Sequence, residues 1–207
     1  MQRRADITYY LRPLFLSDNT TQAYLTNTIQ VADVLEWILE QVGKSDVWMT
    51  TFSISEEFLR RLYFMRKKSE NIHSITVLLD RKATQKTINL WQFIKEVVQD
   101  AYIADNHSKI LLVKSLSGQN VSVVTSQNLT RGNRYESAIV STENNVFNTL
   151  FEQIQDLITY HSIPFYDLYQ RAIGEYPQDG LCLYDNNRDC LYPATSEGGA
   201  ASRHNDA

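Results

Sequence analysis

Two short patterns in the chain combine side chains that can act on a phosphodiester. His107 and Lys109 stand two positions apart at the start of an apolar stretch, and Ser126 and Asn128 have the same spacing at the end of the next one. We expect the two stretches to pair as antiparallel strands, because Gly118 and its polar neighbours are typical of a hairpin connection. Residues two apart on a strand point to the same face, so the hairpin would gather an imidazole, an ammonium, a hydroxyl and a carboxamide in one pocket.

This set of side chains suits phosphoryl transfer. Lys109 and Asn128 would bind the non-bridging oxygens of a phosphodiester, and Ser126 would add a hydrogen bond. His107 could attack phosphorus and form a phosphohistidine that water later hydrolyses. Glu136, which leads the next strand-like segment, could accept from the other ring nitrogen of His107 and fix its tautomer. Either short pattern is common alone, since Ser-x-Asn also caps turns, so the prediction depends on their joint placement.

The same segments resemble the phospholipase D superfamily. The resemblance rests on residues 106–113 (NHSKILLV), 124–130 (VTSQNLT) and 135–140 (YESAIV). The family motif is His-x-Lys, four residues and Asp, followed by Gly-Ser-x-Asn and a later Glu before an apolar strand. The order of elements also fits over residues 5–170, and the resemblance implies a site without metal or cofactor. The residues it marks as catalytic are His107, Lys109, Ser126, Asn128 and Glu136.

The sequence departs from the family pattern at two positions. Lys114 stands where the motif has Asp, Thr125 stands where it has Gly, and the connection between the half-motifs is about four residues longer than usual. The family's Asp is not the nucleophile, so its loss permits activity, and it also permits a degenerate, inactive copy. The positive charge of Lys114 favours phosphate binding in both cases. Arg131 and Arg134 flank the Ser-x-Asn pattern and are further candidates for DNA contacts, because the arginine fork matches phosphate geometry.

The chain carries one copy of a motif that the family's active site needs twice, since one His attacks while another protonates the leaving oxygen. His73 and His161 are each followed by Ser-Ile rather than by x-Lys, so neither completes a second copy. Single-motif members of similar length are nucleases that dimerise across the motif. The resemblance therefore implies a homodimer in which both copies of His107 share one site.

The function implied is that of a metal-independent phosphodiesterase, specifically a nuclease that cleaves DNA. The alternative is a catalytically weak phospholipase-D-like module that binds nucleic acid or assembles a larger complex. A lipid phosphodiesterase is disfavoured, because the chain shows no amphipathic membrane-binding segment. A basic cluster in the second predicted helix is typical of a solvated face, although it could steer phosphate backbones; it comprises Arg60, Arg61, Arg66, Lys67 and Lys68.

Composition is consistent with one globular domain of 207 residues that is 43% hydrophobic. The 20 basic residues are outnumbered by 24 acidic ones, so nucleic-acid binding would depend on a local patch. The longest aliphatic run, residues 110–113, is far too short for a membrane span or a signal peptide. Cys182 and Cys190 form no disulfide framework, and with His161 or His204 they lack the spacing of a zinc site, so we expect free thiols and a cytoplasmic protein.

The alternation of segments predicts an α/β fold with a mixed β-sheet flanked by helices on both faces, a phospholipase-D-like half-site domain. We expect strands at residues 8–16, 46–53, 72–80, 101–113, 121–126 and 136–141. Helices are expected at residues 22–42, 85–98 and 144–160, and one more from a capping box of Ser53 and Glu56 to about Lys68. Trp48, Trp91 and Phe147 fall on apolar stripes and should be core. The domain would span residues 1–171, and residues 172–207 would form a mobile tail.

Overall fold

A computed structural model of the chain describes residues 6–14, 19–83 and 87–172. Eight strands form one sheet: β1 (Thr21–Thr26), β2 (Ser45–Thr51), β3 (Ile72–Asp80), β4 (Asp100–Ala104), β5 (Ile110–Ser115), β6 (Asn120–Thr125), β7 (Glu136–Ser141) and β8 (Ile163–Pro164). The helices are α1 (Val31–Val42), α2 (Glu56–Lys68), α4 (Trp91–Val97), α5 (Asn144–His161) and α6 (Phe165–Ala172), with short 3-10 turns η1 (Ile7–Tyr9) and η2 (Arg81–Ala83).

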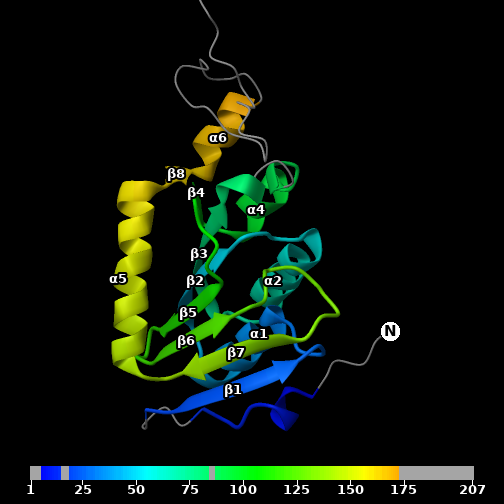
Figure 1. Cartoon of the computed structure of the whole chain (residues 1–207), viewed down its shortest axis with the longest axis vertical. Coiled ribbons are helices and arrows are strands. Elements are labelled where there is room, and N and C mark those ends of the chain that lie inside the picture. Colours follow the sequence, from blue (N-terminus) through cyan, green and yellow to red (C-terminus); the bar gives the residue numbers. More distant parts are fainter. Residues whose placement is uncertain (1–5, 15–18, 84–86, 173–207) are drawn as a thin grey trace, which may run out of the picture.

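The sheet has the order β1-β7-β6-β5-β2-β3-β4-β8 (Figure 1). β2, β3 and β4 are parallel neighbours, and every other pairing in the sheet is antiparallel. The predicted antiparallel pairing of β5 with β6 is confirmed. The sheet is therefore mixed, and its parallel part is the three-strand block β2-β3-β4.

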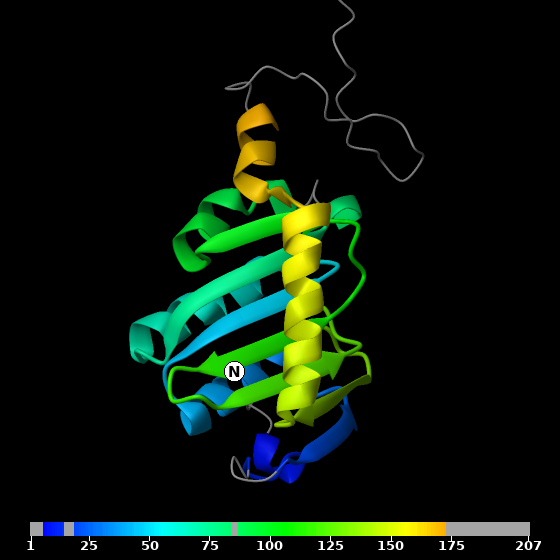
Figure 2. The same ribbon diagram turned by 90° about the vertical axis from the view of Figure 1, so that its left-hand side faces the viewer.

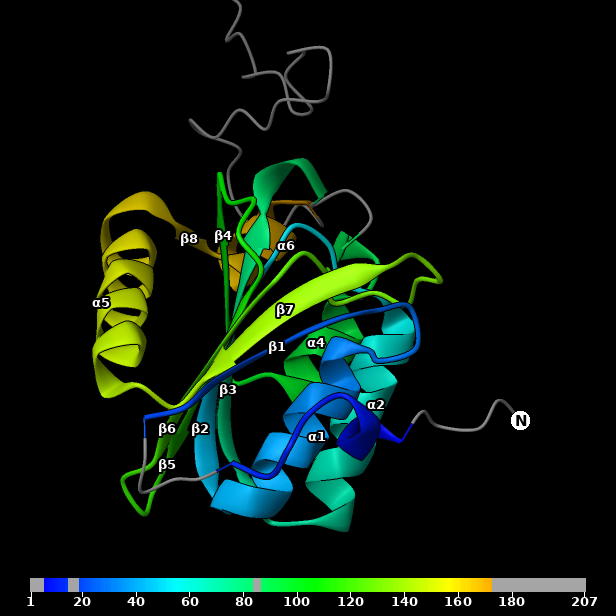
Figure 3. The same cartoon turned by 60° about the horizontal axis from the view of Figure 1, so that its bottom comes forward.

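Helices cover both faces of the sheet, as predicted. α1, α2 and α4 lie on one face and α5 lies on the other (Figure 3). Figure 2 shows α5 crossing in front of the strands. α5 packs through Phe147 and Ile154 onto Leu112 of β5, and the rings of Trp48 and Phe151 meet edge to face at 4.9 Å. Alternate residues of β2 point to opposite faces of the sheet, so they pack into two separate apolar layers, one under each set of helices.

The N-terminal part of the fold differs from the prediction. Residues 22–26 were expected to begin a helix but belong to the edge strand β1, in which Tyr24 and Thr26 are buried and Leu25 is exposed. This alternation with a period of two is what a strand needs to face one side of a core. The predicted strand at residues 8–16 is wrong where the structure describes it: Ile7–Tyr9 is a 3-10 turn, and residues 15–16 lie outside the described residues.

Two helix boundaries also differ. α2 begins at Glu56 because the hydroxyl of Ser55, rather than that of Ser53, accepts a hydrogen bond from the backbone N–H of Phe58 at 3.3 Å. The predicted capping box of Ser53 and Glu56 is therefore wrong by two residues. α4 covers Trp91–Val97 of the helix expected at residues 85–98; residues 87–88 are also helical, and residues 85–86 lie outside the described residues.

The single strand expected at residues 101–113 is two strands. β4 pairs with β3, whereas β5 pairs with β2 on the far side of the parallel block. The polar residues 105–109 connect them without strand structure.

No helix in residues 6–14, 19–83 and 87–172 is long and apolar enough to span a membrane. From residue 173 onward the predicted tail, with both cysteines, lies outside the described residues.

Candidate active site

Three of the predicted site residues, His107, Lys109 and Asn128, lie at the carboxyl ends of β2, β3 and β4. A chain that leaves β4 must pass over the ends of β3 and β2 before it can enter β5, because β5 lies on the far side of β2. Residues 105–109 make this passage, and they carry His107 and Lys109. The carboxyl edge of parallel strands is the usual place for ligand sites in α/β sheets.

His107 and Lys109 lie side by side, although they are not on a strand. Lys109 Nζ donates to the backbone carbonyl of His107 at 2.9 Å and lies 3.5 Å from His107 Nδ1. The second distance is at the long limit for a hydrogen bond, so it does not fix the tautomer of the imidazole. The ring of Phe52 packs against the imidazole with 5.1 Å between centroids. His107 is exposed and Lys109 half-buried, so a substrate phosphate can reach both.

The Ser-x-Asn pattern lies directly beside this pair. The backbone N–H of Thr125 donates to the carbonyl of Lys109 at 3.0 Å and extends the pairing of β5 with β6 by one step. Asn128 lies at the end of β2, where its Oδ1 is 3.4 Å from the hydroxyl of Thr51. The fold thus brings an imidazole, an ammonium and a carboxamide from two separate loops to one edge of the sheet.

Ser126 is bound to Glu136. The Ser126 hydroxyl donates a short hydrogen bond to Glu136 Oε2, and its oxygen accepts from the backbone N–H of Ser137 at 3.1 Å. A hydroxyl has only one proton, so Ser126 cannot also donate to a phosphate in this arrangement. The described residues contain no hydrogen bond between Glu136 and His107, and the orienting role expected for Glu136 stays a prediction.

The charge of Glu136 also reaches a buried tyrosine. Burial raises the pKa of Tyr24 far above its usual value, and the carboxylates of Asp33 and Glu136 raise it further. Tyr24 therefore stays neutral, and the half-buried Glu136 lies close enough to it for its charge to act.

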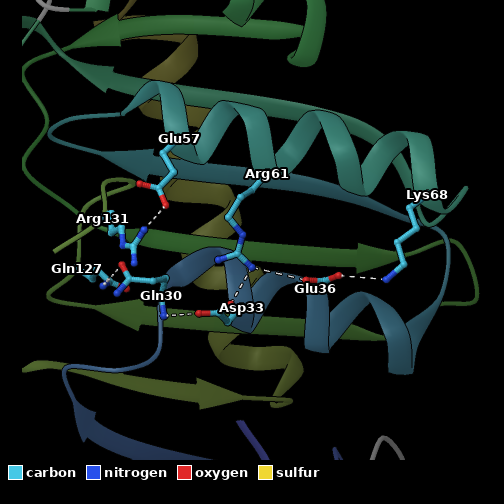
Figure 4. A network of polar contacts seen from close by, with 8 residues as sticks. All are labelled: Gln30, Asp33, Glu36, Glu57, Arg61, Lys68, Gln127 and Arg131. Atoms are coloured by element: carbon cyan, nitrogen blue, oxygen red, sulfur yellow. Dashed lines mark hydrogen bonds and ion pairs between the residues drawn. The ribbon is translucent and has the colours of Figure 1, made fainter. Parts of the chain in front are cut away.

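The three basic residues expected to bind substrate lie in different places. Arg131 donates to Glu57 Oε1 at 2.9 Å (Figure 4). Together with Asn128 it lines an open cleft between the first turns of α1 and α2. Arg134 is exposed in the connection between β6 and β7. Lys114 lies at the far end of β5, about 16 Å along the strand from Lys109, and its Nζ lies 5.7 Å from the centre of the Phe151 ring. The structure does not bring Lys114 to the other site residues.

A pair of glutamines that the sequence analysis missed supports the Ser-x-Asn loop. The buried Gln127 donates through Nε2 to Gln30 Oε1 at 3.0 Å (Figure 4). Gln30 Nε2 in turn donates to the carbonyl of Gly132 at 3.2 Å. Gln30 precedes α1, so the start of this helix holds both ends of the loop that contains Asn128. The available signal was the position of Gln127 between two outward-facing residues.

The basic cluster of α2 has partners within the chain. Arg61 lies 2.8 Å from Asp33 and 3.6 Å from Glu36, and Lys68 lies 3.6 Å from Glu36 (Figure 4). Of the remaining members, Arg60 pairs with Glu56, Arg66 donates to the carbonyl of Val97, and Lys67 lies over the ring of Tyr63. Within the described parts of the chain, no three His, Cys, Asp or Glu side chains are grouped so that they could hold a metal ion.

Comparison with known proteins shows which known fold the chain shares. Neither the models of protein families nor the curated proteins give a match to the sequence. Among solved structures, a phospholipase D family member, Nuc from Salmonella typhimurium, superposes with a TM-score of 0.56 at 14% identity over 71% of this chain and 98% of that one. A phosphatidylserine synthase from Haemophilus influenzae Rd KW20 gives a TM-score of 0.50 at 12% identity, over 76% of this chain but 45% of its own length. The chain therefore has the fold of the phospholipase D superfamily.

Proposed function

We propose that the chain is a metal-independent phosphodiesterase, a nuclease that cleaves DNA through a phosphohistidine on His107. The observation that carries the proposal is the grouping of His107, Lys109 and Asn128 at the carboxyl edge of the parallel strands. An ammonium and an amide can bind the charged oxygens of a phosphodiester while the imidazole supplies the nucleophile. The shared fold with a phospholipase D family member supports the same function.

The first step would transfer the phosphoryl group to the protein. Lys109 and Asn128 bind the two non-bridging oxygens, and an unprotonated ring nitrogen of His107 attacks phosphorus. The bond between phosphorus and the leaving oxygen breaks, and that oxygen takes a proton from the protonated His107 of the partner subunit. Negative charge grows on the oxygens beside Lys109, which is where a fixed cation lowers the barrier.

The second step would release the phosphoryl group. His107 of the partner subunit, now unprotonated, removes a proton from water, and the oxygen of that water attacks phosphorus. The bond between phosphorus and nitrogen breaks and a phosphate monoester leaves. One imidazole is again neutral and the other protonated, so the site has returned to its starting state.

A homodimer is part of this proposal, because one chain supplies one imidazole. An apolar patch suitable for a second subunit lies next to the site, on the face of the sheet that carries α5. Leu25, Val124 and Ile139 are 67%, 44% and 51% exposed, and Val124 and Ile139 are direct neighbours across β6 and β7. Exposed clusters of large aliphatic side chains often mark contact surfaces. We propose that this patch is the contact between subunits.

Plasmid cleavage in EDTA tests the chemistry. The wild type should nick plasmid DNA in the presence of the chelator, because the positive charges that face the phosphate belong to side chains rather than to a metal ion. His107→Ala should not nick it, because this variant lacks the nucleophile. Activity that disappears in EDTA and returns with Mg²⁺ would contradict the proposal. DNA binding without cleavage under any condition would favour the binding module instead.

Sedimentation tests the dimer. Ile139→Asp places a charge in the patch and should give an inactive monomer. Leu116→Asp is the matched control, because Leu116 is 56% exposed on the β5–β6 connection at the other end of the strand. This control should stay dimeric and active. A wild-type protein that is monomeric at the concentrations of the assay would contradict the shared site.

A further inference from the structure

The passage that carries His107 and Lys109 alternates between outward side chains and side chains bound to the sheet. His107 is exposed, whereas the neighbouring Asn106 is buried. The backbone N–H of Asn106 donates to Asp80 Oδ2 at 3.0 Å, at the end of β3. The hydroxyl of Ser108 lies 2.7 Å from the hydroxyl of Thr50, at the end of β2. The passage is therefore fastened to each of the two strand ends that it crosses.

The direction of each hydrogen bond at Thr50 follows from the number of protons. Ser108 donates through its backbone N–H and through its hydroxyl to Asn106 Oδ1, at 3.0 and 2.5 Å. Since the only proton of the Ser108 hydroxyl goes to Asn106, its oxygen must accept from Thr50. The Thr50 oxygen in turn accepts the backbone N–H of Ile110 at 3.0 Å. The chain of donors thus runs from Ile110 to Thr50, from Thr50 to Ser108, and from Ser108 to Asn106.

We infer that Thr50 is a positioning residue of the active site, an inference that rests on the proposed function. Its hydroxyl binds the residues on both sides of Lys109, namely Ser108 and Ile110, and through Ser108 it reaches Asn106 beside His107. Thr50 does not touch substrate. It sets where the backbone holds the imidazole and the ammonium relative to the phosphate.

Water cannot replace this hydroxyl, because Thr50 is 1% exposed. Without it the N–H of Ile110 and the oxygen of Ser108 lose their partner, and the passage can move to reach water. A displacement of about 1 Å at a reacting group can cost on the order of 100-fold in rate. Removing the hydroxyl should therefore lower turnover more than substrate binding.

Steady-state cleavage of a short DNA duplex by three variants tests the inference. Thr50→Val keeps the size of the side chain and removes the hydroxyl, and we expect kcat to fall about 10- to 100-fold with KM within about twofold. Thr50→Ser keeps the hydroxyl and should stay within about threefold of the wild type in kcat. Thr76→Val is the control: Thr76 pairs with Trp48 on the adjacent strand β3, on the same face as Thr50 and away from the site, and it should behave as the wild type.

Hydrogen exchange of the Ile110 amide gives a second measurement that needs no activity. This amide should be protected in the wild type and in Thr50→Ser, and exchange faster in Thr50→Val. If Thr50→Val does not fold, Ser108→Ala breaks the same chain at a partly exposed position and should lower kcat in the same way.

The outcomes separate this inference from the proposed function. A wild type that cleaves DNA, together with a Thr50→Val variant of equal kcat, would overturn the inference alone. Equal losses in Thr50→Val and Thr50→Ser would also overturn it, because the hydroxyl would then not be the cause. A wild type that cleaves no phosphodiester would overturn the proposed function and this inference with it.

Discussion

Replacing Thr51 by Val should destabilise the fold and disturb Asn128, although the two side chains are nearly the same size. Thr51 is fully buried at the end of β2, where its hydroxyl accepts the backbone N–H of Leu129 at 3.1 Å and that of Ser53 at 3.3 Å. It donates to the carbonyl of Ser53 at 2.8 Å. Thr51→Val replaces the hydroxyl by a methyl group and leaves no cavity. The change in stability therefore reports the loss of these hydrogen bonds alone.

The magnitude follows from the burial of each partner. The N–H of Leu129 is buried, and a buried donor without a partner costs about 1–3 kcal/mol. Ser53 is half-buried, so water can replace part of its loss and leave about 0.5–1 kcal/mol. We expect the free energy of unfolding to fall by about 1.5–4 kcal/mol in total. With a urea dependence of about 2 kcal/mol per molar, the midpoint should fall by about 0.8–2 M.

Urea unfolding followed by circular dichroism measures this difference. Thr51→Ser is the matched control, since it keeps the hydroxyl and loses one methyl group, which costs about 1 kcal/mol. The Val variant should therefore be less stable than the Ser variant, and it should also lose activity because Leu129 adjoins Asn128. A Val variant as stable as the wild type, or more stable than Ser, would refute the reasoning that the hydroxyl joins β2 to this loop.

Three further predictions concern charged residues. Burial raises the pKa of Asp46, but hydrogen bonds from Ser74 and His73 and the nearby positive charges outweigh it and hold the pKa below its ordinary 3.8. An aspartate with a lowered pKa stabilises the folded state above pH 3.8, and this stabilisation is lost as the pH falls below 3.8. Asp46→Asn removes this contribution, so the free energy of unfolding measured in urea should fall less steeply below about pH 4 than in the wild type. Glu136→Gln should slow single-turnover cleavage about 10²- to 10⁴-fold with unchanged DNA affinity, and a rate equal to that of the wild type would remove Glu136 from the mechanism. Lys114→Gln should leave cleavage and DNA affinity unchanged in fluorescence anisotropy, because Lys114 lies at the other end of β5; weaker binding would show that DNA reaches that end.

The sequence predicted most of the sheet and the long helix because their burial patterns are regular. The alternation in β7 and the three-to-four spacing in α5 each fit one period only, and both elements lie within a residue of their expected bounds. Residues 22–26 were misassigned because Leu25 fits a helical stripe, whereas the side chain that packs into the core is that of Tyr24. The local sequence pattern cannot decide between helix and strand here, because β1 forms by pairing with β7, which lies more than 100 residues later in the chain.

The sequence identified the residues of the site but not the structural elements that position them. The spacing of His107 and Lys109 identified two side chains that do share a face, but the expected reason, a continuous strand, is wrong. They share a face because Asn106 and Ser108 turn toward the sheet. The partners that hold them lie on other strands, and Thr50 is 58 positions from Ser108. Only the strand order reveals that this passage crosses the ends of β3 and β2.

The covalent intermediate tests the central claim most directly. Wild-type protein would be mixed with a DNA oligonucleotide in EDTA and denatured in alkali within one turnover, since alkali preserves bonds between phosphorus and nitrogen. Mass spectrometry of the peptides should find the oligonucleotide fragment on His107, and the adduct should be absent from His107→Ala. DNA that is cleaved without an adduct, or with the adduct on another residue, would contradict the assignment of His107 as the nucleophile.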